Sequence, residues 1–180
     1  PEEMDDIWRK MDQRLKLLSR QESFVNFTKQ NHLTSTSRVI DTYDTSIGFA
    51  CLNSAWLSAS EKDKGNLVLS RAQFNDAYQH IENADVKVAL WHHPFACLHE
   101  SDASRSKAQV LQRFHLCLNG HFHEEDGNSV VSPDGQSQIF TCPALYAKGE
   151  QSGFMCYQLD MSSRKLNIHS FRWNERKGFF

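Results

Sequence analysis

The sequence of 180 residues lacks the features that mark several large classes of protein. It has no apolar run long enough to cross a membrane and no signal peptide at its start. Its formal net charge is only −2, with both signs mixed along the chain, so a broad cationic surface for nucleic acid is not predicted. Internal repeats and low-complexity tracts are also absent. These absences favour a soluble globular protein with no membrane partner, and we expect it in the cytoplasm.

The cysteines follow no recognisable pattern. There are five cysteines, an odd number, and no Cys-x-x-Cys pair occurs. Four of them lie inside apolar runs: Cys51, Cys117, Cys142 and Cys156. This usage predicts buried free thiols in a reducing compartment rather than a disulfide framework.

Apolar content of 39% and charged content of 23% fit one globular domain with a single core. Apolar residues at helical spacing begin almost at once after Pro1, so we expect the chain to be cut from a longer one. The expected elements are a helical segment at 1–30, strands at 37–44 and 46–54, a helix at 71–82 capped by Ser70, a strand at 86–91, a helix at 104–113 and a strand at 114–118. An antiparallel β meander is expected over 128–175, with turns at Pro133-Asp134-Gly135 and Ser162-Ser163-Arg164.

Two histidine clusters carry the chemistry of the sequence. Trp91-His92-His93-Pro94 follows one apolar strand, and Gly120-His121-Phe122-His123 follows the next. Each cluster alone is more often structural than functional, because single histidine pairs arise by chance. Together, each at a strand end with a helix between them, they predict a metal site, since neutral imidazole is the commonest protein ligand of transition metals. We expect Gly120 to supply the backbone freedom that the second cluster needs.

These motifs resemble the C-terminal half of the calcineurin-like metallophosphoesterases, strongly over 86–124 and diffusely over 46–175. The resemblance implies an α/β sandwich of two packed mixed sheets flanked by helices, here lacking its first strands. It also implies a centre with two metals, of Mn, Fe or Zn, whose bridging hydroxide hydrolyses a phosphomonoester or phosphodiester. By matching positions, His92 and His121 bind one metal and His123 binds the other. His93 is the candidate catalytic residue, which contacts the phosphate or supports the loop, and Asn119 steadies the glycine loop.

The family's N-terminal motifs are missing from the sequence. No Asp-x-His and no Gly-Asp occurs, and Gln30-Asn31-His32-Leu33 is a poor match to Gly-Asn-His-Asp/Glu. These motifs supply the bridging carboxylate, so we expect the chain alone to bind at most one metal, weakly, and to be inactive. The missing half would come from the same gene or from a partner chain. The alternatives are a non-catalytic binding or scaffold module and an effector segment of a larger protein.

Several further positions admit two interpretations. His99, Glu100 and Asp102, in a loop expected at 95–103, either line the substrate mouth or form a solvated loop, and we favour the latter. Asn53 either points to the site or forms a turn. Glu124, Glu125 and Asp126 either support the metal ligands or form an acidic turn. Finally, an exposed sheet edge is expected where strands are missing, which favours a homo-oligomer or the addition of a partner strand.

Overall fold

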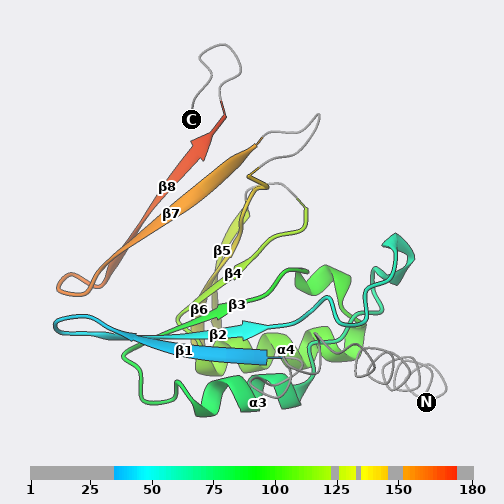
Figure 1. The fold of residues 1–180 in the computed structure, drawn as a ribbon, viewed down its shortest axis with the longest axis horizontal. Coiled ribbons are helices and arrows are strands. Elements are labelled where there is room, and N and C mark those ends of the chain that lie inside the picture. Colours follow the sequence, from blue (N-terminus) through cyan, green and yellow to red (C-terminus); the bar gives the residue numbers. More distant parts are fainter. Residues whose placement is uncertain (1–34, 123–125, 133–134, 146–151, 174–180) are drawn as a thin grey trace, which may run out of the picture.

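The computed structural model describes residues 35–122, 126–132, 135–145 and 152–173. These residues form an α/β fold with a mixed six-stranded sheet and a separate two-stranded hairpin (Figure 1). The elements are β1 (Ser35–Asp41), β2 (Ser46–Leu52), η1 (Glu61–Asp63), α3 (Arg71–Gln79), β3 (Val86–Leu90), η2 (Phe95–Cys97), α4 (Glu100–Arg113), β4 (Leu116–Asn119), β5 (Asp126–Ser132), β6 (Gly135–Thr141), β7 (Gly153–Asp160) and β8 (Lys165–Arg172).

The six-stranded sheet has the order β1-β2-β3-β4-β6-β5. Its centre is parallel, from β2 through β3 and β4 to β6, and an antiparallel strand closes each side. Helix α3 forms the crossover between β2 and β3, helix α4 forms the one between β3 and β4, and β5 lies between β4 and β6 in the chain. All the parallel strands therefore end at the same edge of the sheet, where binding sites gather in open α/β folds.

Helices α3 and α4 cover one face of the sheet (Figure 1). Strand residues that face them are small, and Gly48 shows why: a Cβ built there would lie 2.6 Å from Ile81 Cβ. The core between sheet and helices is apolar and includes Ala50, Leu69, Phe74, Val110 and Phe114. Aromatic contacts join the helices across it, with the Phe74 and Phe114 ring centroids 6.2 Å apart. This packing holds the sheet rigid beneath the loops at its edge.

The hairpin of β7 and β8 rises from the other side of the sheet (Figure 1). Tyr157 of β7 connects it to the sheet, with its ring centroid 5.5 Å from that of Phe140 on β6. Its two strands pair in antiparallel register, and Phe154 stacks on Phe171 at 4.8 Å. The outer half of the hairpin leaves apolar side chains in solvent, including Leu159 and Ile168.

Several sequence predictions are confirmed by these elements. The strands expected at 37–44 and 46–54 pair as the first hairpin, the strand leading to His92 is β3, and Ser70 caps α3 by accepting a hydrogen bond from the Gln73 N–H. The α3 helix ends at Gln79 rather than at residue 82. The loop expected at 95–103 is wrong, because η2 occupies its first part and α4 begins at Glu100.

The expected β meander is divided between two sheets. Its first hairpin, β5–β6, joins the main sheet because β6 pairs in parallel with β4. Its second hairpin, β7–β8, forms the separate sheet, so within the described residues the second sheet of the expected sandwich has only two strands. The helical segment expected at 1–30 and the turn residues Pro133 and Asp134 lie outside the described residues.

The cysteines are free, as predicted, but they are not all buried. Cys117 is buried in the sheet, Cys51 and Cys142 are half-buried, and Cys156 is exposed on β7. Cys156 is exposed because it lies opposite His169 on the polar face of the hairpin. Among the described helices, none is both long and apolar enough to cross a membrane.

Candidate metal centre

Strand register brings the two histidine motifs together. Leu90 of β3 lies opposite Leu118 of β4, so the residues that follow each strand continue side by side. The parallel hydrogen bonds extend past the strand ends: the Trp91 N–H donates to Leu118 O at 3.1 Å, and the Gly120 N–H donates to His92 O at 3.0 Å. Positions 29 apart in the chain are therefore fixed as neighbours by backbone pairing.

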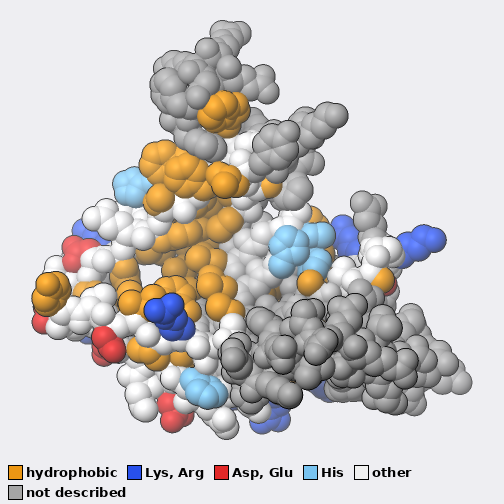
Figure 2. All heavy atoms as spheres, in the orientation of Figure 1, with side chains coloured by type: hydrophobic (Ala, Val, Ile, Leu, Met, Phe, Trp, Pro, Cys, Tyr) orange, Lys and Arg blue, Asp and Glu red, His pale blue; other side chains and the backbone are white. Residues whose placement is uncertain are grey.

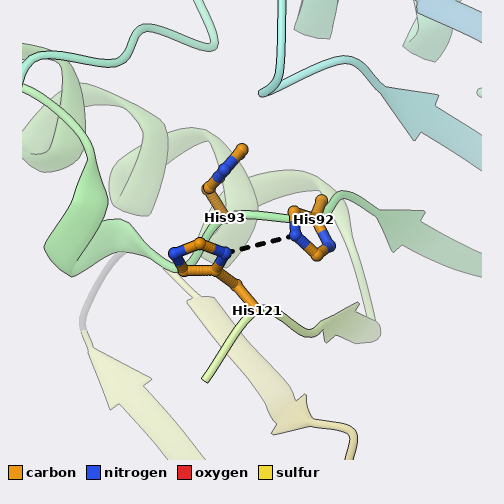
Figure 3. A group of neighbouring side chains, drawn as sticks. All are labelled: His92, His93 and His121. Carbon is orange, nitrogen blue, oxygen red and sulfur yellow. Dashed lines mark hydrogen bonds between the residues drawn. The ribbon is translucent and has the colours of Figure 1, made fainter. Parts of the chain in front are cut away.

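His92, His93 and His121 form one cluster at this edge (Figure 3). One ring nitrogen from each residue lies within 4.8 Å of the other two. The shortest separation joins His92 Nε2 and His121 Nδ1, at 3.2 Å. Figure 2 shows His side chains gathered on the surface in this region, where β3 ends.

The His92–His121 pair fits a shared metal ion. Two nitrogens that each lie 2.0–2.1 Å from a tetrahedral zinc are about 3.3 Å apart, because the bonds meet near the tetrahedral angle. The observed 3.2 Å matches that separation. The same distance also fits a hydrogen bond between the rings when one nitrogen carries a proton. A shared metal would require both nitrogens to be unprotonated and to point at the ion rather than at each other.

His93 differs from the other two because it is buried, with only 6% of its surface exposed. Its Nδ1 lies 3.1 Å from Ser54 Oγ, and its backbone N–H donates to the same hydroxyl at 2.8 Å. Burial, followed by the charges of His92 and His121, lowers the pKa of His93 to about 4. At neutral pH the ring is therefore uncharged and its orientation is fixed.

The unusual backbone of the second motif is at His121, not at Gly120. His121 has a φ of 81°, in the left-handed region that side chains rarely adopt. Gly120 shows no such need, since a Cβ built there would meet His92 Nδ1 at 3.7 Å and Cys142 O at 3.9 Å, in ordinary contact. The expectation that the glycine supplies the freedom is thus corrected. The strained residue carries the ring, as is common at functional sites.

Asn119 steadies this loop, as predicted. It is buried, and its Oδ1 accepts a hydrogen bond of 2.8 Å from Thr141 Oγ1 on β6. Its backbone carbonyl also accepts from the Cys142 N–H. The end of β4 is therefore held on one side by β3 and on the other by β6.

Sequence reasoning missed Ser54 and considered its neighbour Asn53 instead. Asn53 forms a turn, because its Oδ1 accepts from the Ala55 N–H, and its backbone is held by Gln73. Ser54 is 1% exposed and is the residue that reaches His93. The available signal was its position directly after β2, next to β3 in the sheet.

The polar residues after the first motif are structural. His99 caps α4, and Glu100 lies exposed in the first turn of that helix. Asp102 is buried, and its carboxylate accepts from the Leu69 and Ser70 N–H groups. The solvated loop favoured for these residues is therefore wrong for Asp102, which joins α4 to the segment that precedes α3.

Some candidate residues cannot be placed. His123, predicted to bind the other metal, lies outside the described residues, as do Glu124 and Glu125. In the part of the chain that the structure describes, the cluster contains histidines and no carboxylate.

The fold and the cluster together define an α/β protein with a candidate three-histidine metal site. No protein-family model matches the sequence, and no curated protein matches it. Solved structures do match the fold at low identity. A provisionally named 5′-nucleotidase from Staphylococcus aureus, in complex with alpha-ketoglutarate, is 11% identical with a TM-score of 0.45, over 82% of this chain and 34% of that chain.

Two further structures are similar to the chain at the same level. The Thermus thermophilus sulfate thiohydrolase SoxB, in complex with glycerol, is 15% identical with a TM-score of 0.43, over 76% of this chain and 24% of that chain. A hypothetical protein, also from Thermus thermophilus, is 12% identical with a TM-score of 0.46, over 76% of this chain and 61% of that chain. The chain thus spans less than two thirds of each structure, and these scores assign it neither a family nor a function.

Proposed function

We propose that this chain provides half of a metal-dependent phosphoesterase centre, with His92 and His121 as two ligands of one metal. The observation that supports this most directly is the 3.2 Å separation of His92 Nε2 and His121 Nδ1 at the ends of two parallel strands. Imidazole ligands suit Mn, Fe or Zn. When bound, such a metal polarises phosphoryl oxygens and lowers the pKa of a bound water.

The residues of the chain have separate parts in this proposal. His92 and His121 offer lone pairs, and the left-handed backbone of His121 aims its ring at His92. His93 is neutral at physiological pH, and the ring nitrogen that does not contact Ser54 can carry the proton and donate a hydrogen bond to a phosphoryl oxygen. Ser54 positions His93 by contacting both its ring and its backbone. His123 remains the proposed ligand of a second metal.

The proposed centre needs carboxylates from elsewhere. No carboxylate belongs to the cluster in the described residues, and a bridging carboxylate is what keeps two close cations from repelling each other. We propose that a segment or partner chain with Asp-x-His, Gly-Asp and Gly-Asn-His motifs completes it. Candidate substrates are phosphomonoesters and phosphodiesters, and we propose a cytoplasmic location.

The same observation favours a second function, a non-catalytic metal-binding or scaffold module. A cluster that holds metal through histidines alone can bind a partner or an anion without hydrolysis. The two functions separate in a hydrolysis assay. The 180-residue chain should not hydrolyse bis-p-nitrophenyl phosphate, whereas its mixture with the completing segment should do so only if the catalytic function is right.

Metal titration of the 180-residue chain tests the site itself. We expect one equivalent of Zn²⁺ or Co²⁺ to bind. Calorimetry measures the binding of either metal, and the visible spectrum reports the binding of Co²⁺. His92→Ala and His121→Ala should each weaken binding by at least about tenfold, because each removes a direct ligand. His169→Ala is the matched control, since His169 is an exposed histidine on β8. Equal affinity of the His121→Ala variant and the unchanged chain would contradict the assignment.

A further inference from the structure

A lysine and an aromatic ring stand at the rim of the histidine cluster. Lys64 Nζ lies 5.2 Å from the centroid of the Phe122 ring, over its face. Phe122 follows His121 directly, and the two ring centroids are 5.4 Å apart. Phe122 is 40% exposed, so its ring is accessible from solvent. The pair therefore borders the cluster on its solvent side.

The loop that carries Lys64 is fixed to the first histidine motif rather than free in solvent. The Gly65 N–H donates to Cys97 O at 2.9 Å, and the His99 N–H donates to Leu67 O at 2.8 Å. These bonds attach the loop to the segment directly after Pro94. Gly65 has a φ of 82°, which turns the chain there and which residues with side chains rarely adopt. The position of Lys64 is thus set by backbone contacts.

Lys64 is a cation without a carboxylate in the described part of the chain. Its ring contact with Phe122 leaves the three ammonium protons available to solvent or to an anion. Burial raises the pKa of the Cys97 thiol, and the positive charge of Lys64 partly offsets this rise. Lys64 therefore interacts electrostatically with the segment that follows Pro94. In Figure 2, Lys or Arg atoms lie beside the exposed His side chains. A single positive charge, held by an aromatic face at the edge of a metal site, is suited to an anionic ligand.

We propose that Lys64 and Phe122 form a rim subsite for a second anionic group of the substrate. This inference rests on the proposed function, in which a metal held by His92 and His121 would bind the phosphoryl group. The substrate class is then a phosphoester whose leaving group carries a further negative charge. Phe122 positions the ammonium through its ring face, and Lys64 pairs with the second anion.

Two phosphoesters that differ by one charge test this inference. The Zn²⁺-loaded chain should bind 4-carboxyphenyl phosphate about three- to fivefold more tightly than phenyl phosphate by calorimetry, the size expected of one exposed ion pair. Lys64→Ala should remove this preference while leaving phenyl phosphate affinity within about twofold, and Lys64→Arg should retain it. Lys62→Ala is the matched control, because Lys62 is an exposed lysine on the same loop.

The outcomes separate the rim subsite from the metal site. If the unchanged chain binds both phosphates equally, or if Lys64→Ala keeps the preference, the rim subsite is wrong and the metal site stands. If the chain binds Zn²⁺ but neither phosphate, the rim subsite is wrong, whereas the metal ligands are tested separately by the metal titration. If Lys62→Ala also removes the preference for 4-carboxyphenyl phosphate, the preference is a general effect of positive charge. That result would overturn the role of Lys64. Circular dichroism of each variant verifies that the exposed substitutions leave the fold intact.

Discussion

His93 is the residue whose environment departs most from that of a free histidine. It is enclosed by Ser54, His92 and His121, and only its neutral form is compatible with that site at physiological pH. An unfolded histidine has a pKa near 6.5. His93 is therefore protonated at a lower pH in the folded protein than in the unfolded chain.

This difference predicts that the metal-free protein loses stability in mild acid. Between pH 6.5 and about 4 the unfolded chain binds a proton at position 93 that the folded chain does not, so stability falls as the pH falls through this window. The loss should be on the order of 2 kcal/mol after allowing for screening and coupling. Urea unfolding at pH 7 and pH 5 measures it.

His93→Gln should flatten that pH dependence, because glutamine does not titrate. His169→Gln, which changes an exposed histidine, should leave the slope as it is. A slope that is the same in the His93→Gln variant and in the unchanged protein would show that His93 is not the titrating group.

His121 shows a second residue-scale feature, a left-handed backbone on a residue that bears a functional ring. Such a conformation costs on the order of 1–2 kcal/mol for a residue with a Cβ. The backbone contacts of Gly120 and Asn119 with the neighbouring strands hold the loop and so maintain it. The geometry of the candidate site is thus supported by strand pairing on both sides.

Among the elements, β2 and the segment that follows α3 approach each other closely enough for a substitution to probe the contact. A Cβ at Gly48 would lie 2.6 Å from Ile81 Cβ and 3.0 Å from Ala84 Cβ. Both atoms are attached directly to the backbone, so they cannot rotate away. The chain after the helix must therefore approach β2 over a residue without a side chain.

Gly48→Ala should destabilise the protein by about 1–3 kcal/mol through overpacking. Thermal or urea unfolding measures the change. Gly120→Ala is the control, because its new Cβ would make only ordinary contacts at 3.7 Å and beyond, and we expect a change within about 0.5 kcal/mol. Similar losses for the two variants would show that the close approach at Gly48 is relaxed at little cost.

At the scale of the whole molecule, β1 is an edge strand of the described sheet, and apolar side chains are exposed along it. Val39 is 39% exposed and Ile40 is 44% exposed. An uncovered edge with apolar side chains is a template for pairing with another chain. The exposed apolar side chains of β1 agree with the expectation that the chain forms an oligomer or adds a strand from a partner. That expectation stays a prediction.

We expect the purified chain to self-associate at micromolar concentrations, as followed by sedimentation velocity. Ile40→Lys should shift it toward monomer, because a lysine on an edge strand opposes pairing with a second copy. Thr36→Lys, on the same face of β1 and also exposed, tests whether added charge alone is enough. A chain that is monomeric throughout this range would contradict the prediction.

The local elements and the candidate ligands could be predicted from the sequence. Strand-type segments and turn residues predicted the β1–β2, β5–β6 and β7–β8 hairpins, Ser70 predicted the start of α3, and each histidine motif was expected at a strand end. These signals succeed because they act over a few neighbouring residues, through backbone preferences and capping. The helix expected at 104–113 is α4, which ends at Arg113 as predicted but begins at Glu100, because its first turn resembles a polar loop.

Contacts between residues that are distant in the sequence depend on the tertiary structure. The contact between Ser54 and His93 spans 39 positions, and the parallel pairing of β6 with β4 separates two hairpins that look alike in sequence. The left-handed backbone of His121 and the position of Lys64 over Phe122 likewise depend on strands and loops that pack from different parts of the chain. Such contacts follow from the register of the sheet and from burial, and no local pattern of residues encodes them.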